Sequence, residues 1–373
     1  MRIAIFLSGF NTSESRLQPW LTLLEVGAYL KAAGHDVWLV TDKSSNDTLA
    51  LPTKRFKSLR GTESAAIAKW VGDFKPARSV VSVSPFSLAT AGWHAALDAQ
   101  TTWAHLPYAL YNAKEISVAW KHLAASARWG FGRNLFIPKT LWRQRLARRF
   151  KGVICQSLRT TARIGSDIKC KVISPGLDLG KWQPVEHALT TEEQRTFLYV
   201  GSSTSIRGFD VLLEAMRLLP PDICLRVLAR GINKTAELQI NKRLAGYGLS
   251  SRVKVNGGWL STEVLISEIQ HATAVVLPFV LVPSELPVSV MEAIACGIPV
   301  IVSDIDGLPE TAGSAGLVVS PGNAVALAAT MQRLAMDNTL QQSLRKACLE
   351  QRKGYQSWPV IARLWADVLE VPL

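Results

Sequence analysis

The feature that most constrains the fold is a pattern of apolar strands and amphipathic helices that occurs twice along the chain. In the first series, Arg2–Ser8 alternates like a strand, Pro19–Ala33 has helical leucine spacing, Gly34 ends the helix, and Val37–Thr41 is the next strand. A strand, a helix and a second strand within about 40 residues predict a βαβ unit of a parallel sheet.

Short apolar runs continue both series. The first predicted sheet goes on with Ser79–Ser84, Thr101–His105, Val153–Gln156 and Val172–Ser174. The second contains a helix at Phe209–Leu218 and the strands Phe197–Val200, Leu225–Leu228, Val253–Asn256, Ala274–Pro278, Pro299–Val302 and Gly316–Val319. The predicted fold class is therefore α/β, with two Rossmann-like, doubly wound domains. Ligands of such sheets bind beyond the carboxyl ends of the strands, here in the cleft between the domains.

Composition agrees with two domains and places limits on location. The chain has 373 residues, 48% hydrophobic and 19% charged, which is enough for two cores. The start, MRIAIFLSGF, reads as a strand and not as a signal peptide, and no run of 18 apolar residues occurs. The five cysteines are scattered without a CxxC pair, which favours reduced thiols and argues against a metal cluster. We expect a cytoplasmic protein, soluble or peripheral to a membrane.

The segment SELPVSVMEAIACGIPVIVSD carries the most chemical information. It follows a predicted strand, passes a turn, and enters a helix near Pro287. The free N–H groups of a first helical turn and the helix dipole suit a diphosphate. Glu292, about one and a half turns into the helix, is placed to accept bonds from ribose hydroxyls. From spacing alone, a buried helix with Glu292 in a structural hydrogen bond is an equal alternative.

This segment resembles the donor-site motif of family 4 retaining glycosyltransferases of the GT-B fold. Glu292–Gly297 and Pro299–Ile301 match the second half of that motif, and the match implies that Glu292 binds the nucleotide ribose. The first acidic position of the motif falls on Ser284, and Glu285 stands one place later, so either residue could take its role toward the sugar. The resemblance also places Leu286, Pro287 and Val288 at the donor.

A second stretch, YVGSSTSIRGFDVLLEAM, matches the family where two basic residues grip the donor diphosphate. Ser202 stands where Arg is usual, and Arg207–Gly208 stands for a Lys–Gly pair. Arg is physically adequate, since a guanidinium binds phosphate in a bidentate manner. In the first domain the resemblance implies a cleft-facing loop at Gly9 and a cleft-facing His105 that touches the transferred sugar. A plain turn at Gly9 and a packed structural His105 remain open.

Weaker matches extend the resemblance over most of the chain. They lie at Gly34–Val37, Ile173–Asp178, Asp306–Glu310 and Ser357–Trp358. Gly176–Glu186 reads as an interdomain connector. We predict an acceptor-binding domain at residues 1–178, a nucleotide-sugar-binding domain at residues 190–352, and a C-terminal helix at residues 353–373 that packs back on the first domain.

The net charge of +13 comes largely from one segment. Residues 116–166 contain no Asp or Glu, and their cations are Lys121, Arg128, Arg133, Lys139, Arg143, Arg145, Arg148, Arg149, Lys151, Arg159 and Arg163. Interleaved aromatics are Trp120, Trp129, Phe131, Phe136, Trp142 and Phe150. This mixture favours an anionic membrane surface, with Arg143, Arg145, Arg148 and Arg149 as the contact. A pocket for a phosphorylated acceptor, a solvated face and a nucleic-acid surface are the alternatives.

Together these patterns predict a retaining hexosyltransferase that uses a nucleotide-diphosphate sugar. Its expected acceptor is a lipid-linked or cell-envelope glycan, at the inner face of the membrane. The expected catalytic residues are His105 and Glu285, without a metal or other cofactor and without nucleic acid as a partner. A GT-B nucleotide-sugar epimerase and a non-catalytic membrane adaptor are the alternative functions.

Overall fold

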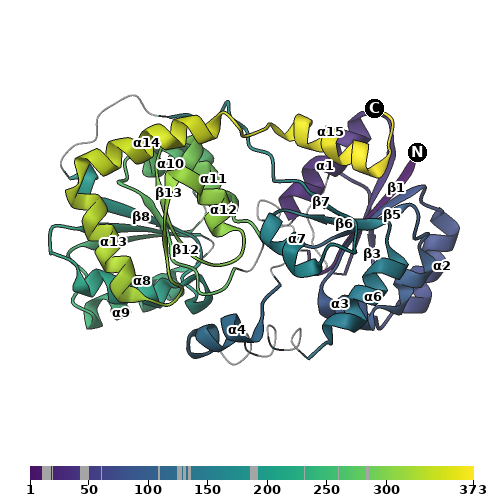
Figure 1. The fold of residues 1–373 in the computed structure, drawn as a ribbon, viewed down its shortest axis with the longest axis horizontal. Helices are drawn as coiled ribbons and strands as arrows, with labels where there is room; N and C mark the ends of the chain where they lie inside the picture. The colour runs from purple at the N-terminus through teal and green to yellow at the C-terminus, as the bar shows by residue number, and fades with distance from the viewer. Residues whose placement is uncertain are drawn as a thin grey trace.

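The computed structural model describes residues 1–10, 18, 20–42, 50–59, 61–107, 110–123, 128, 132, 136–184, 192–230, 232–258, 260–282 and 285–373. These residues form two α/β domains side by side, each built on a parallel sheet (Figure 1). The predicted pair of doubly wound domains is confirmed.

The first domain contains a seven-stranded sheet in the order β3-β2-β1-β4-β5-β6-β7. Its strands are β1 (Arg2–Leu7), β2 (Asp36–Thr41), β3 (Thr53–Arg55), β4 (Arg78–Ser82), β5 (Thr102–His105), β6 (Gly152–Cys155) and β7 (Cys170–Val172). Its helices are α1 (Trp20–Ala32), α2 (Ser64–Phe74), α3 (Pro85–Thr90), α4 (Ala113–Ala119), α6 (Lys139–Arg149) and α7 (Leu158–Ile164), with 3-10 turns η2 (Gly92–Ala96) and η3 (Trp120–His122). The edge strand β3 was not predicted.

Strand β1 shows how the first sheet is packed. Ile3, Ile5 and Leu7 point to one face and pack with α1, whereas Ala4 and Phe6 point to the other face. This period of two, with both faces apolar, is the pattern of a parallel strand covered by helices on both sides.

The second domain contains a six-stranded sheet in the order β10-β9-β8-β11-β12-β13. Its strands are β8 (Thr196–Val200), β9 (Cys224–Arg230), β10 (Val253–Gly258), β11 (Val275–Leu277), β12 (Val300–Ser303) and β13 (Gly316–Val319). Its helices are α8 (Phe209–Leu218), α9 (Lys234–Gly246), α10 (Thr262–Gln270), α11 (Val288–Ala295), α12 (Leu308–Ala312), α13 (Ala324–Met336) and α14 (Asn338–Arg352), with 3-10 turns η4 (Glu193–Arg195), η5 (Ser205–Arg207) and η6 (Gly313–Ala315).

The chain passes between the domains twice, near Leu177 and near Gln356, and these two segments lie against each other. The backbone N–H of Leu177 donates to the carbonyl of Gln356 at 2.9 Å. Gly176 packs so closely on Trp358 that an added Cβ would lie 2.7 Å from its ring. After this crossing, α15 (Trp358–Leu369) returns to the first domain and packs on α1 (Figure 1).

Helix α15 completes the core of the first domain. Ile361, Trp365 and Leu369 are buried with Ile3, Ile5 and other residues of β1 and α1. Strand β1 therefore depends on residues more than 350 positions away in the chain for cover on one face.

We expect Trp365→Ala to destabilise the first domain by about 3–5 kcal/mol, because the side chain is fully buried and its loss leaves a cavity. Chemical denaturation would measure the change. Leu364→Ala, on the same helix at a side chain that is 41% exposed, is the matched control and should change stability by less than about 1 kcal/mol. Equal losses of stability from the two substitutions would contradict the assignment of Trp365 to the core of the first domain.

Candidate functional site at the interdomain cleft

The order of the second sheet reverses between β8 and β11, so the loops that follow these strands diverge at its carboxyl edge. Such a switch point is where open α/β sheets bind ligands. The two loops are hydrogen-bonded to each other. Val280 and Leu281 donate backbone N–H bonds to the carbonyl of Ile206 at 3.0 and 3.1 Å.

Gly208 makes this contact possible. Its φ of 71° lies in the left-handed region, and an added Cβ would stand 1.8 Å from the carbonyl oxygen of Pro278. No other residue fits there without moving the loop. The predicted Arg207–Gly208 pair is thus fixed at the edge of the sheet.

Arg207 and Ser202 lie together in the loop after β8. The Arg207 guanidinium lies 5.3 Å from the centre of the Phe279 ring, a cation–π contact with the loop after β11. The carbonyl of Ser202 accepts a bond of 2.6 Å from the Tyr199 hydroxyl, and its side chain lies 3.1 Å from that of Thr204. Arg207, the cation predicted to bind the donor diphosphate, is therefore already held in position by Phe279.

Helix α11 begins directly after Pro287, as the sequence predicts. No side chain of the described residues caps its first turn. Leu286 and Pro287 are buried, whereas Val288 and Glu292 are partly exposed and lie one turn apart on the same face. Ser284 lies outside the described residues.

Glu285 does not occupy the position expected of a residue that touches the sugar. Its side chain is fully buried and its carboxylate reaches the first domain, where it accepts bonds from the N–H of Gln156 (2.7 Å), the N–H of Ser157 (2.6 Å) and the hydroxyl of Ser157 (2.7 Å). Its own N–H donates to the carbonyl of Pro107 at 2.8 Å. Burial raises the pKa of Glu285 to about 8, and the donors from Ser157 and Gln156 oppose that shift. Glu285 joins the two domains.

Further carboxylates of the second domain surround the start of α7. Glu310 accepts from the N–H of Leu158 at 3.0 and 3.1 Å, and Asp304 pairs with Arg159 at 2.9 Å. We call this group, together with Glu285, Asp306, Gln156, Ser157 and Arg163, the interdomain latch. Negative charge at a helix start is favourable, because the first N–H groups have no partner within the helix. The weak family match at Asp306–Glu310 gave no sign of these partners at α7.

Asp306 is the strained member of the latch. It is not a glycine, yet its φ is 45°, and its carboxyl oxygens are buried without a hydrogen-bond partner among the described residues. The Arg163 guanidinium lies 3.9 Å away. Burial raises the pKa of Asp306 to about 7, with Arg163 and Arg159 opposing the shift and Glu115 and Glu310 adding to it.

His105 is fully buried, whereas the resemblance implies a side chain that faces the cleft. Its side chain is 0% exposed and packs edge-on against Trp365 of α15, with ring centres 5.4 Å apart. Burial lowers the pKa of His105 to about 3, so the ring is neutral near pH 7. β5 lies between β4 and β6, and Trp365 of α15 packs on the His105 ring at its end.

Gly9 is at the carboxyl end of β1 with a φ of 74°, and its N–H donates to the Asp42 carboxylate at 2.5 Å. Asp42 also accepts from Ser8 and from the N–H of Leu59. The predicted turn exists and is held by an acidic side chain. Among the described residues, no three His, Cys, Asp or Glu side chains gather as a possible metal site.

In the basic segment, residues 116–166, more of the arginine side chains are partly buried than the sequence predicts. Arg143 pairs with Asp167, Arg145 donates to the carbonyls of Leu88 and Ala89, and Arg149 donates to the carbonyl of Gly92. Of the four arginines predicted to contact a membrane, Arg148 is the exposed one. The aromatic residues Trp142 and Phe150 are buried in the core, because α6 packs on the sheet through that face. Three of the four arginines predicted to contact a membrane are therefore bonded within the first domain.

Exposed apolar side chains nevertheless remain in this segment. Phe136 is 76% exposed and Trp120 is 47% exposed, and the Arg128 guanidinium lies 5.3 Å from the Trp120 ring. Lys121 and Lys139 are also exposed. No helix of the described residues is long and apolar enough to cross a membrane.

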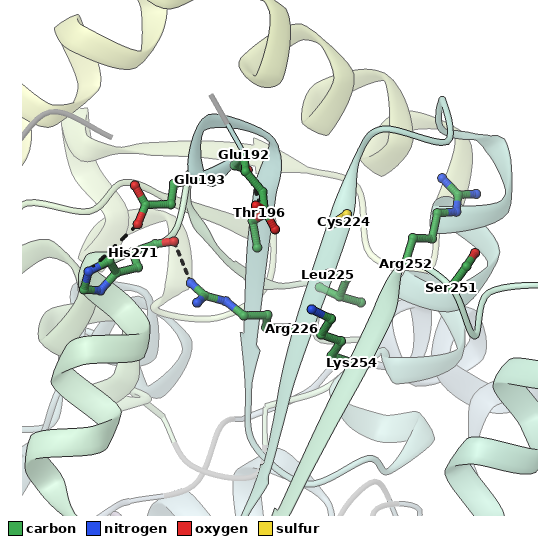
Figure 2. Close-up of a pocket in the computed structure, with 10 residues that line it drawn as sticks. All are labelled: Glu192, Glu193, Thr196, Cys224, Leu225, Arg226, Ser251, Arg252, Lys254 and His271. Atoms are coloured by element: carbon green, nitrogen blue, oxygen red, sulfur yellow. Dashed lines mark hydrogen bonds and ion pairs between the residues drawn. The ribbon is translucent and has the colours of Figure 1, made fainter. Parts of the chain in front are cut away.

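A hollow of about 390 Å³ lies at the opposite edge of the second sheet, where β8, β9 and β10 begin (Figure 2). Thr196, Cys224 and Lys254 line it. Arg226 donates to the carbonyl of His271 at 2.6 Å, so the wall is built from internal contacts. This edge is the amino end of the strands, away from the loops that hold Arg207 and α11.

Comparison with known proteins finds a family that matches most of the second domain. The family described as Glycosyl transferases group 1 matches residues 194–337, which run from β8 through α13. The O-antigen chain mannosyltransferase B of Escherichia coli is 29% identical over 166 residues, which are 43% of this chain and 42% of that protein. The match thus spans less than half the length of either protein.

Solved structures resemble the chain over nearly its whole length. Sucrose-phosphate synthase from Thermosynechococcus elongatus has a TM-score of 0.75 at 21% identity, covering 99% of this chain and 98% of that one. Anabaena Alr3699/HepE in complex with UDP has a TM-score of 0.72 at 14% identity, covering 99% of each chain. At these identities the likeness shows the fold, which is the two-domain GT-B fold.

We expect Asp306→Asn to remove part of the pH dependence of stability. The folded protein keeps the Asp306 proton up to about pH 7, whereas the unfolded chain releases it near pH 4, so stability falls as pH rises between these values. Across the whole interval between these two pH values, the free energy of unfolding falls by about 4 kcal/mol. Asparagine also tolerates a positive φ. Unfolding free energies at pH 5 and pH 8 should therefore differ less in the variant than in the parent.

The matched control is Asp73→Asn, at an exposed position on α2. Its unfolding free energies at pH 5 and pH 8 should differ by as much as those of the parent. An Asp306→Asn variant with that same difference would contradict the assignment.

Proposed function

We propose that this chain, whose second domain is a Glycosyl transferases group 1 domain within a GT-B fold, transfers a sugar from a nucleotide-diphosphate donor to an acceptor hydroxyl. The observation that carries the proposal is the switch point of the second sheet. There the loop holding Arg207 is locked to the loop after β11, which leads into α11. The family match covers these same residues.

In this proposal the donor diphosphate lies between Arg207 and the start of α11. The leaving diphosphate gains negative charge as the bond to the sugar breaks, so a cation fixed in advance lowers the barrier. The first N–H groups of α11, at the positive end of the helix dipole, add a second favourable contact for the diphosphate. Glu292, partly exposed one turn along from Val288, binds the ribose. Neutralisation is assigned to these protein groups and not to a metal ion.

The proposal assigns no sugar contact to His105 or Glu285. The carboxylate of Glu285 already accepts three bonds from Gln156 and Ser157, and His105 is sealed under α15. Both act by holding the domains and sheet in place. Retention of the anomeric configuration stays part of the proposal, on the strength of the resemblance.

We further propose that the acceptor is a lipid-linked or cell-envelope glycan reached at the inner face of a membrane. The partial match to an O-antigen chain mannosyltransferase supports a glycan acceptor. The exposed Phe136 and Trp120, beside exposed lysines, support contact with anionic lipid.

Arg207→Ala should weaken binding of the donor's nucleoside diphosphate by roughly 10- to 100-fold, because a hydrogen bond to a charged group contributes about 1.5–3 kcal/mol. Titration calorimetry across UDP, GDP, ADP and TDP would measure it. Arg217→Ala, an exposed arginine near the end of α8, is the control and should bind like the parent. Failure of the parent to bind any of the four would sink the donor assignment.

Phe136→Ser should reduce binding to vesicles containing phosphatidylglycerol by roughly tenfold, because an exposed phenylalanine loses about 1.5–3 kcal/mol of apolar burial at the surface. Sedimentation with vesicles at low and high salt would show it. Leu218→Ser, a 56% exposed apolar residue on α8 of the second domain, is the control. Equal losses in both variants would refute a membrane contact at Phe136.

A further inference from the structure

The segment that follows β5 leaves the first domain and crosses to the second. Residues 110–123, which we call the α4 arm, contain α4 and η3. The arm is tied to the first domain at its base, because the Arg163 guanidinium donates to the carbonyl of Leu110 and to the carboxylate of Glu115. Asn112 and Glu115 form a capping box that fixes where the helix begins.

The apolar face of the arm is buried in the other domain. Ile116, Ala119 and Leu123 are 4%, 0% and 3% exposed and belong to the core cluster of the second domain. At the far end, an added Cβ on Gly322 would lie 3.2 Å from the His122 ring. The arm is therefore a bridge whose base lies in one domain and whose side chains pack in the other (Figure 1).

Tyr111 connects this bridge to the loop after β11. Its hydroxyl accepts a bond from the N–H of Val282 and donates one to the carbonyl of the same residue. Burial raises the pKa of Tyr111 well above 10, so the hydroxyl keeps its proton and can make both bonds at any ordinary pH. One side chain thus satisfies both backbone groups of a loop residue.

The loop that Tyr111 holds is the one that supports Arg207. Val280 and Leu281 donate to the carbonyl of Ile206, the residue before Arg207. Phe279 lies under the Arg207 guanidinium at 5.3 Å. A path of direct contacts therefore runs from the arm through Tyr111, Val282 and residues 279–281 to the diphosphate-binding cation.

We infer that Tyr111 is a positioning residue for the donor diphosphate, acting through the loop at residues 278–282 and through Arg207. The inference rests on the proposed function. It gives the α4 arm a role in donor binding, because the arm lets the first domain set the conformation of a loop in the second. Loss of the hydroxyl leaves the N–H and the carbonyl of Val282 without these bonds, and the loop loses its fixed conformation.

The test uses the full chain and the nucleoside diphosphate that binds most tightly among UDP, GDP, ADP and TDP. Tyr111→Phe should raise its Kd roughly tenfold, the effect of one lost positioning contact. Tyr29→Phe, on α1 of the first domain, is the matched control and should bind like the parent.

A double variant separates positioning from a structural role. If Tyr111 acts through Arg207, Tyr111→Phe should add little to the loss already caused by Arg207→Ala. A merely structural tyrosine would lower the unfolding temperature and leave the Kd of the folded protein unchanged, which would overturn the inference. The same tenfold loss in the parent and in the Arg207→Ala background would also overturn it.

The two levels of the proposal fail differently. If the parent binds the diphosphate, Arg207→Ala weakens it and Tyr111→Phe does not, the inference alone is wrong. If the parent binds none of the four diphosphates, the proposed function is wrong and the role of Tyr111 falls with it.

Discussion

One fully buried carboxylate links the two domains. Glu285 lies in the second domain, and its carboxylate accepts three bonds from Gln156 and Ser157 of the first. A carboxylate removed from water is costly unless its lone pairs are satisfied, so these bonds must form together when the domains meet. The residue before α7, Ser157, is thereby bonded to the second domain.

The rest of the latch shows a balance between attraction and desolvation. Glu310 and Asp304 meet the start of α7 and Arg159 at the surface of the interface, where water still screens them. Asp306 lies deeper, with its oxygens buried and its backbone in the left-handed region. Strain and burial at one residue are tolerated where surrounding structure fixes the chain, and they gather at functional interfaces. The latch borders the loops that carry the proposed donor site.

Local patterns predicted much of the second domain because its determinants are local. The bounds of α8 are those expected from its leucine spacing, and α11 begins after Pro287 because a proline at a helix start is compatible with the missing N–H. The three-residue strand β3 has no apolar alternation in its sequence TKR, so only its pairing with β2 reveals it. In the basic segment, composition counted the arginines correctly, but the carbonyls of Leu88, Ala89 and Gly92 that hold them are far away in the chain.

The sequence by itself predicted two parallel α/β sheets, the turn at Arg207–Gly208 and the helix start before Glu292, since the apolar periodicity, the glycine and the proline that mark them are local signals. Tertiary structure decided where the remaining side chains act. His105 became a core residue because Trp365 folds back over it, and Glu285 became an interdomain contact because Ser157 meets it from the other domain. These outcomes depend on contacts between residues 128 to 260 positions apart, and spacing along a chain carries no record of them.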